Sequence, residues 1–125
     1  MNALAELRSR FIQVLSELTP DPATFAAMVK PTQDANFGDF QANCAMPLGK
    51  RLGKPPREVA QEIVARLATK HHAALVKFQH VFDDACKRAP EKHWIWDGVH
   101  PTYSGHQLMA DEWVRTVKEF WPAGK

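Results

Sequence analysis

Apolar residues recur every three or four positions at the start of the chain, and this spacing is the strongest constraint on the fold. The series consists of Leu4, Leu7, Phe11, Leu15 and Leu18. Because an α-helix has 3.6 residues per turn, side chains at this spacing share one face. The segment from Thr19 to Pro22 contains two prolines, which cannot continue the helical hydrogen bonds. The spacing therefore predicts an amphipathic helix over residues 4–18.

Further helices are predicted from the same spacing and from the residues that typically begin and end helices. They cover residues 23–29, 43–52, 55–67, 81–88 and about 102–120. Asn43 is the expected N-cap of the second of these, because its side chain can accept a hydrogen bond from a free backbone N–H. Gly53 suits the left-handed position that follows that helix. Thr102 or Ser104 is expected to cap the last helix.

Two segments are expected to be extended. Residues 30–40 are polar and contain proline and glycine, which favours a strand-like segment with a turn at residues 36–38. Residues 75–78 are predicted to form a short strand, although Leu75 is also compatible with continuing the preceding helix. A strand there needs an edge to pair with, either the segment 30–40 or the same strand of another chain.

The composition is that of a globular protein with a core. The chain has 125 residues, 45% of them hydrophobic, which corresponds to one average domain or two very small ones. The net charge of +2 leaves only local clusters of cations as a basis for nucleic-acid binding. Cys44 and Cys86 are too few for a disulfide framework, which favours the cytoplasm. No apolar run approaches the roughly 20 residues that span a membrane, so no membrane partner is expected.

Several side-chain types raise further possibilities. The six histidines include no His-x-x-x-His pair, so neither a metal site nor a cofactor is expected. Asp111 and Arg115, four apart on the last predicted helix, are expected to form an ion pair. Tryptophans bury a large area, so all four are expected to lie in the core. They are Trp94, Trp96, Trp113 and Trp121.

The first half of the chain contains long runs that are typical of one known family. The runs are Lys30–Asp34, Asn36–Met46 and Leu48–Ala60. On these runs, residues 1 to about 67 resemble the N-terminal additional domain of bacterial arginyl-tRNA synthetases. The resemblance implies a small α+β module that contacts the elbow of tRNA and performs no chemistry.

The same resemblance implies a set of candidate tRNA contacts. They are the exposed members of the group Phe37, Asp39, Phe40, Gln41 and Asn43. An aromatic ring can stack on an unstacked base, and amides can read its edges. Four cations that lie within eight residues of one another can meet phosphates. These are Lys50, Arg51, Lys54 and Arg57. The alternative is that the two phenylalanines belong to the core and the cations form a solvated helix end.

The second half carries a different resemblance. Its residues 74–79, 96–102, 105–106 and 110 resemble the C-terminal end of SGNH (GDSL-type) hydrolases. In that family an Asp-x-x-His pair supplies two members of a catalytic triad, so Asp97 and His100 match those positions. The family's nucleophilic serine and oxyanion residues come from earlier segments, and nothing before residue 68 contains them. The pair is therefore expected to be vestigial.

The two resemblances lead to an interpretation of the chain as a chimera. Residues 1–67 and 68–125 would be its two modules, with a join between Ile63 and His72 that arose by artificial fusion or by gene rearrangement. The expected fold is α+β and mostly helical, with helices packed on a small sheet assembled from both fragments. Because each half is marginal alone, a homo-oligomer that exchanges helices between chains is expected.

The expected function follows from this interpretation. We expect a protein that is not an enzyme and whose activity is at most weak, salt-sensitive tRNA binding by the first half. One alternative is a residual esterase that uses Asp97 and His100. Another is a structural fold with no ligand.

Overall fold

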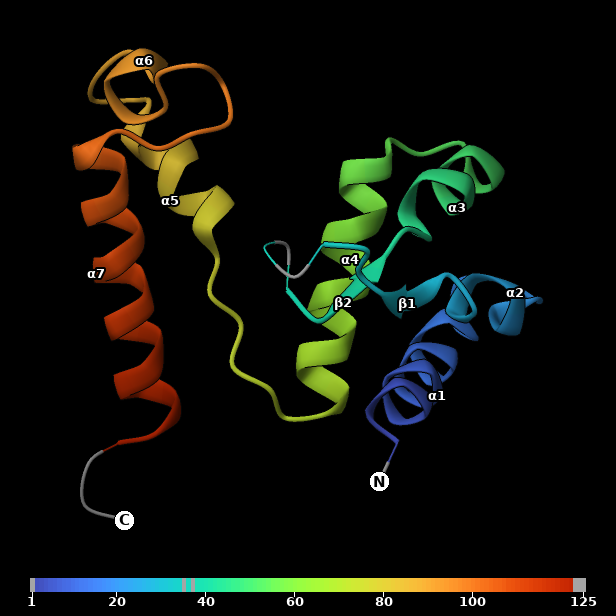
Figure 1. The fold of residues 1–125 in the computed structure, drawn as a ribbon. Coiled ribbons are helices and arrows are strands. Elements are labelled where there is room, and N and C mark those ends of the chain that lie inside the picture. Colours follow the sequence, from blue (N-terminus) through green and yellow to red (C-terminus); the bar gives the residue numbers. More distant parts are fainter. Residues whose placement is uncertain (1, 35, 37, 123–125) are drawn as a thin grey trace. The chain divides into compact units, whose positions relative to one another are not determined.

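The fold consists of two compact units, one ending at Ala73 and the other beginning at Ala74 (Figure 1). The structure is a computed structural model that describes residues 2–34, 36 and 38–122. Each unit has its own hydrophobic cluster.

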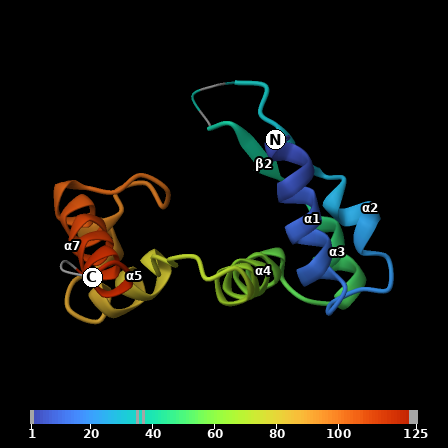
Figure 2. The same ribbon diagram turned by 90° about the horizontal axis from the view of Figure 1, so that it is seen from below.

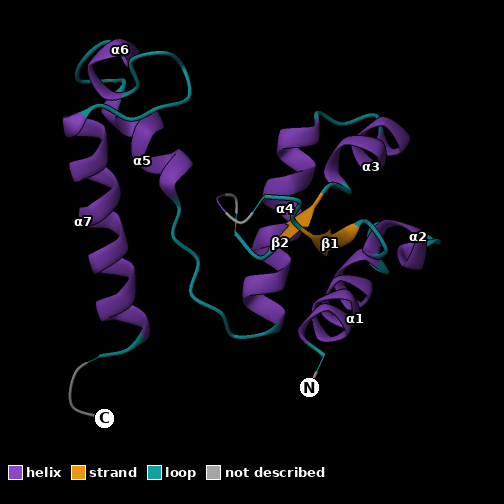
Figure 3. Cartoon of the chain, in the orientation of Figure 1, coloured by secondary structure: helices purple, strands orange, loops and turns teal. Residues whose placement is uncertain are grey.

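The first unit contains four helices and a two-stranded sheet (Figure 3). The helices are α1 (Ala3–Leu15), α2 (Pro22–Ala26), α3 (Ala45–Leu52) and α4 (Pro56–Lys70), and the strands are β1 (Val29–Pro31) and β2 (Phe40–Ala42). Helix α1 packs against α2, β1 and α4, and α4 also packs against α3. The unit is thus a helical layer that supports one short antiparallel hairpin.

Helix α1 confirms the predicted amphipathic helix but ends three residues early. The Asn2 side chain caps its start by accepting a hydrogen bond from the backbone N–H of Ala5 at 3.2 Å. After Leu15 the backbone tightens into turns, in which the N–H of Leu18 bonds to the carbonyl of Leu15 at 2.9 Å. Leu18 still packs against the core, so the apolar spacing was right even though the helix had ended.

The corner between α3 and α4 forms as its sequence predicts, but the start of α3 does not. Gly53 adopts the left-handed conformation, with φ of 66°, and the N–H of Lys54 bonds back to the carbonyl of Gly49 at 2.9 Å. The N-cap of α3 is Cys44, so the prediction of Asn43 as the cap is wrong. Packing decides this position, because the buried Cys44 side chain joins the core and its carbonyl accepts the first helical hydrogen bond, from Leu48.

The core of the first unit brings together side chains from all four of its helices and from Cys44, the N-cap of α3. Its buried members are Val14, Leu15, Phe25, Ala26, Cys44, Leu48, Val59 and Ile63. Burial raises the pKa of the Cys44 thiol, because desolvation disfavours the thiolate. Cys44 is therefore a structural residue.

The second unit contains only helices among its described residues. They are α5 (Phe78–Ala85), α6 (Glu91–Trp94) and α7 (Tyr103–Phe120). Helix α5 lies three residues earlier than predicted, and α6 was not predicted. Both α5 and α6 pack against α7, and Figures 1 and 2 show α5 alongside it. The Thr102 side chain caps α7 by accepting a hydrogen bond from the N–H of Gly105 at 3.1 Å, which confirms one of the two predicted caps.

The predicted strand at residues 75–78 is wrong. Residues 73–77 have no regular structure, and Phe78 is the first residue of α5. The described sheet consists of β1 and β2 alone, both from the first unit. A strand needs a partner for its backbone hydrogen bonds, and the described sheet provides none for residues 75–78.

The core of the second unit is small, and most of the tryptophans lie outside it. Its buried members are Phe82, Ala85 and Trp94. Trp96, Trp113 and Trp121 are 63%, 54% and 61% exposed, so the prediction that they are core residues is wrong. With only two helices and one short turn to pack against, α7 buries a single narrow side.

The ion pairs on α7 also differ from the prediction. Arg115 bonds to Glu112 at 2.7 Å and to Glu119 at 2.7 Å, and not to Asp111. The Asp111 carboxylate instead accepts a hydrogen bond from the Gln107 amide at 2.8 Å. Arg115 has carboxylates three residues before it and four residues after it, and this pair of contacts outcompetes the single predicted one.

The mostly helical α+β class is confirmed, with the sheet contributed by the first unit alone. Among the described residues, none of the helices combines the length and the apolar character needed to cross a membrane.

Candidate nucleic-acid interface

The β1–β2 hairpin presents the residues that the sequence singled out as nucleic-acid contacts. The strands are antiparallel, with Lys30 opposite Gln41 and Pro31 opposite Phe40. Successive side chains of a strand point to opposite faces, so Phe40 and Gln41 lie on different sides of the ribbon. The hairpin therefore offers an aromatic ring on one face and an amide with a neighbouring lysine on the other.

The connection between the strands is held by hydrogen bonds near its base. The N–H of Thr32 bonds to the carbonyl of Asp39 at 3.1 Å, and the Thr32 hydroxyl donates to the carbonyl of Gly38. The Asp34 carboxylate accepts from the backbone N–H of Asn36 at 2.9 Å, as is typical of an Asx-turn. Gly38 has φ of 87°, which a residue with a Cβ adopts only with strain. Of the predicted extended segment 30–40, only its two ends are strand, and Phe37 in the predicted turn at 36–38 lies outside the described residues.

Arg8 fixes the hairpin to the first helix. Its Nε donates to the carbonyl of Val29 at 2.9 Å, and one Nη donates to the carbonyl of Ala27 at 3.3 Å. These carbonyls lie just after α2 and at the start of β1, so one side chain connects both elements to α1. This role was not predicted from the sequence. An arginine one turn away from both Leu4 and Phe11, beside the apolar stripe, was the available signal.

The candidate contacts on the hairpin are accessible to a ligand. Asp39 and Asn43 are exposed, Phe40 is 37% exposed and Gln41 is half-buried. The alternative of a core Phe40 is therefore wrong, while Phe37 lies outside the described residues. Because Asn43 does not cap α3, its amide is not committed to the helix start. Three polar groups and one ring thus face solvent along β2 and its ends.

The candidate cations lie around the α3–α4 corner. Lys50 and Arg51 occupy the last turn of α3, and Arg57 lies in the first turn of α4. All are exposed, as is Lys54 between them. The Arg51 guanidinium also lies over the Phe25 ring, 5.9 Å from its centroid. At a rise of 1.5 Å per residue, α3 separates this corner from Asn43 by about 10 Å.

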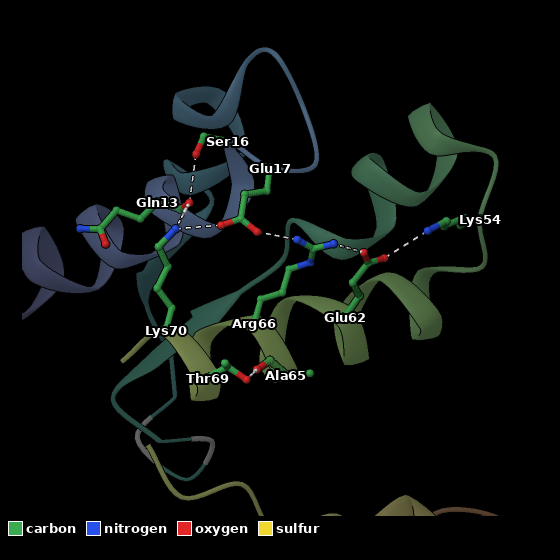
Figure 4. Close-up of polar contacts among 9 residues, drawn as sticks. All are labelled: Gln13, Ser16, Glu17, Lys54, Glu62, Ala65, Arg66, Thr69 and Lys70. Atoms are coloured by element: carbon green, nitrogen blue, oxygen red, sulfur yellow. Dashed lines mark hydrogen bonds and ion pairs between the residues drawn. The ribbon is translucent and has the colours of Figure 1, made fainter. Parts of the chain in front are cut away.

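Lys54 belongs to a ladder of ion pairs that the sequence analysis missed (Figure 4). Its Nζ lies 3.1 Å from Glu62, which pairs with Arg66 at 2.8 Å. Arg66 also contacts Glu17 at 2.5 Å, and Glu17 contacts Lys70 at 2.8 Å. The signal was the spacing of Glu62 and Arg66, four apart on one helix. The partnership with Glu17 depends on how α1 and α4 pack, which the sequence does not reveal.

The ladder changes the titration of its carboxylates. Hydrogen bonds from Lys70 and Arg66 hold the pKa of Glu17 below its ordinary value, and those from Arg66 and Lys54 do the same for Glu62. Since the charged forms are favoured in the fold, the ladder contributes stability above the ordinary glutamate pKa of about 4.3. This contribution is lost as the pH falls through the lowered values. The ladder thus fixes the end of α1 to α4 at neutral pH.

Asp97 and His100 form the contact that their spacing predicts. The His100 Nδ1 lies 2.6 Å from one Asp97 carboxylate oxygen, and the other oxygen accepts from the N–H groups of His100 and Val99 at 2.7 Å and 3.0 Å. These three hydrogen bonds lower the pKa of Asp97 to about 2, the backbone bond from His100 most strongly. The carboxylate thus closes a tight turn as well as orienting the imidazole.

A nucleophile is not evident beside the Asp97–His100 pair. Ser104 lies in the first turn of α7 and is half-buried, and no hydrogen bond between Ser104 and His100 is formed in the described structure. The Thr102 hydroxyl does not serve as the nucleophile either, because it donates to the carbonyl of His93 at 2.7 Å. Within the described residues, no three His, Cys, Asp or Glu side chains are arranged to hold a metal ion.

Comparison with protein families matches residues 5–82 to the arginyl tRNA synthetase N terminal domain. The matched residues include nearly all of the first unit and continue into α5. They extend past the predicted join at residues 63–72. The resemblance of the later residues to SGNH hydrolases stays a prediction.

Individual relatives are arginine–tRNA ligases. The ligase of Rhodopirellula baltica is 51% identical over 61 residues, which is 49% of this chain and 9% of the relative. The ligase of Synechocystis is 41% identical over 68 residues, or 54% of this chain and 12% of the relative. That of Hydrogenovibrio crunogenus is 46% identical over 66 residues. The chain therefore spans about a tenth of the length of these relatives. No solved structure matches the chain.

Proposed function

Because the chain belongs to the family of arginyl-tRNA synthetase N-terminal domains, we propose that its first unit binds tRNA weakly and performs no chemical step. The observation that carries this proposal is the exposed group along β2, which lies inside the matched residues. Binding to tRNA also implies a cytoplasmic setting. The ligase activity of the relatives is not part of the proposal, because the chain spans so little of their length.

The two exposed groups have different tasks in this proposal. The Phe40 ring stacks on an unpaired base, and the Gln41 and Asn43 amides hydrogen-bond to base edges. Lys50, Arg51 and Arg57 meet phosphates at the other end of α3. Lys54 contributes less, because Glu62 neutralises it in the ladder. With so few phosphate contacts, binding is weak and falls steeply with salt.

The phosphate contacts are tested by the salt dependence of binding. The affinity of the full chain for labelled bulk tRNA is measured by fluorescence anisotropy at increasing salt concentrations. Arg57→Ala is expected to reduce the slope of log affinity against log salt by about one. Lys92→Ala, an exposed cation of α6, is the matched control and leaves the slope unchanged. Affinity that is insensitive to salt contradicts the proposal, as does an equal effect of both substitutions.

The base contact is tested separately. Phe40→Ala is expected to weaken tRNA binding by about fivefold or more, because stacking on one base contributes about 1–3 kcal/mol. Met46→Ala is the control, since Met46 is an apolar residue of α3 that is more exposed than Phe40. If Phe40→Ala binds as tightly as the control, the hairpin does not contact the base.

For the second unit, we propose that Asp97 and His100 serve the turn and catalyse nothing, as a remnant of an SGNH-type segment in a chimeric chain. The many hydrogen bonds of the Asp97 carboxylate support this role. Hydrolysis of a chromogenic short-chain ester is measured for the full chain and for His100→Ala. Equal rates are expected. A rate that depends on His100 favours the residual esterase.

A further inference from the structure

A groove lies between α5 and α7 of the second unit, and most of the residues that line it are charged. Figures 1 and 2 show the two helices side by side. The groove has a volume of about 440 Å³. Its lining consists of Lys77, His80, Val81, Asp84 and Arg88 from α5 and its two ends, and of Glu112 and Arg115 from α7.

Both carboxylates of the groove are already paired with cations. Glu112 accepts hydrogen bonds from the Arg115 guanidinium, at 2.8 Å from Nε and 2.7 Å from Nη2, and its side chain is only 11% exposed. Asp84 lies 2.7 Å from the Lys87 ammonium and 3.4 Å from His80. Each carboxyl group has a pKa below its ordinary value, because the cation that bonds to it favours the charged form. The paired carboxylates therefore repel an approaching anion only weakly.

Two cations of the groove, in contrast, form no ion pair with another described residue. They are Lys77, which precedes α5, and Arg88, which follows it. The Arg88 guanidinium lies over the Trp94 ring, 5.4 Å from its centroid, and this contact positions the cation without neutralising it. The groove thus has unpaired positive charge beyond both ends of α5.

The placement of these two cations favours an extended polyanion over a single anion. Helix α5, which separates them, is about 12 Å long at a rise of 1.5 Å per residue. Donors that bind one small anion converge on it, whereas a nucleic-acid strand carries a phosphate on every nucleotide and can meet cations that lie apart. Because packed helices lie roughly 8–10 Å apart, the groove between them suits one strand better than a duplex.

We propose that the groove between α5 and α7 binds the phosphate backbone of a single-stranded nucleic acid. Lys77 and Arg88 each bond to one phosphate, and His80 contacts the strand between them. With only two unpaired cations, the binding is weak and falls as the salt concentration rises. This site goes beyond the tRNA binding proposed for the first unit, because different residues carry it.

The first test is the salt dependence of binding to a labelled oligouridylate of about 12 nucleotides, a length typical of one single-strand site. Fluorescence anisotropy measures the affinity of the full chain at increasing salt concentrations. Lys77→Ala is expected to weaken binding about two- to fivefold and to reduce the slope of log affinity against log salt by about 0.7. Arg88→Gln is expected to have the same effects. Lys92→Ala, at an exposed lysine of the same unit that does not line the groove, is the control and changes neither quantity.

The same comparison is repeated in the Arg57→Ala background, in which the phosphate contacts proposed for the first unit are weakened. The difference between Lys77→Ala and Lys92→Ala is expected to persist there, since Arg57 and Lys77 belong to different units. This arm distinguishes the two proposals. If the first unit does not bind phosphates, Arg57→Ala has no effect of its own and the effect of Lys77→Ala remains.

The second test needs no substitution. In NMR spectra of the natural chain at constant pH, the oligouridylate is expected to shift the imidazole signals of His80, which lines the groove. The signals of His106, which is exposed on α7 outside the groove, are expected to stay unchanged. Inorganic phosphate is the probe for a single-anion site. It is expected to shift the His80 signals only at a phosphate concentration about tenfold or more above that of the oligonucleotide, because it lacks the second contact.

Three results overturn the proposal. The first is an equal effect of Lys77→Ala and Lys92→Ala on the salt slope, in either background. The second is an oligouridylate that leaves the His80 signals unchanged or shifts those of His106 equally. The third is inorganic phosphate that shifts the His80 signals at the same phosphate concentration as the oligonucleotide, which makes the groove a site for a single anion.

Discussion

The two units bury their apolar residues to different extents. Within the described residues, the first unit gathers eight buried residues into one cluster, whereas the second gathers three. The first unit also has ion pairs that join residues far apart in the chain, such as Glu17 with Arg66. Each ion pair among the described residues of the second unit lies within one helix or one turn, such as Arg115 with Glu112. Tertiary contacts therefore stabilise the first unit, and local contacts dominate the second.

This difference agrees with the function proposed for the first unit. A binding surface needs a rigid support, and the hairpin of the first unit rests on a packed core. The second unit has large exposed apolar residues and a thin core, so few buried contacts stabilise it. All four tryptophans lie in the second unit, so their fluorescence reports its unfolding, while far-UV circular dichroism reports both units.

The largest effect is expected from shortening a core leucine in the first unit. Leu48 is a fully buried residue of α3 in the core of the first unit. Leu48→Ala is therefore expected to lower the free energy of unfolding by about 2–5 kcal/mol. Leu108→Ala is the counterpart in the second unit and is expected to cost about 1–2 kcal/mol, because Leu108 is only half-buried. Urea unfolding followed by both signals measures the two losses. A larger loss for Leu108→Ala contradicts the comparison.

A smaller effect is expected at Gly105, where α7 meets α6. A Cβ on Gly105 would overlap the carbonyl oxygen of Trp94 and lie 3.0 Å from the Cβ of Pro101. Gly105→Ala is therefore expected to destabilise the second unit by about 1–3 kcal/mol. The shift is read from the urea midpoint of the tryptophan signal. Ser104→Ala, at the adjacent position, is the control and should change stability by no more than about 0.5 kcal/mol. Equal midpoints for the two variants would show that the helix can move away from Trp94.

The smallest effect is expected from the Asp97 turn and concerns pH. The pKa of Asp97 is about 2 in the fold, below its ordinary value of 3.8, so the ionised carboxylate stabilises the folded state. This contribution is present above about pH 4 and is lost as the pH falls toward 2. Asp97→Asn is expected to lower the melting temperature of the second unit at pH 5, with the difference from the natural chain narrowing by pH 2.

The control for this prediction is Asp83→Asn. Asp83 is exposed on α5 and accepts a hydrogen bond from Gln79 at 2.7 Å. The melting temperature of Asp83→Asn is expected to run parallel to that of the natural chain across the same pH range. If the melting temperatures of Asp97→Asn and the natural chain differ by the same amount from pH 5 to pH 2, the stability of the turn does not depend on the carboxylate charge.

The helices of both units could be predicted because their signals are local. The stripe beginning at Leu4, the glycine at position 53 and the cap at Thr102 each act within a few residues of their own position. The short helix α6 and the exact limits of α5 were missed, since four and eight residues carry little periodic signal. The strand at 75–78 failed because a strand needs a partner, and propensity alone does not provide one.

Some features of the candidate site could be predicted from the sequence, but the pairing of its charges could not. Asp39, Phe40 and Asn43 are exposed and Gln41 is half-buried. The Asp97–His100 contact follows from a spacing of three in a turn. Nothing in the sequence indicated that Glu62 would neutralise Lys54, or that Arg8 would fix the hairpin. Both contacts join elements whose separation in space is set by the packing of α1 and α4.

The sequence by itself determined the helical character of the chain, the α3–α4 corner and the family of the first unit. These depend on residue types at fixed spacings. The tertiary structure alone decided which tryptophans are buried, which cations are paired and where the sheet ends. These depend on contacts between distant residues, since the burial of a large side chain is decided by the area that neighbouring elements can cover. Three exposed tryptophans are the result in the second unit.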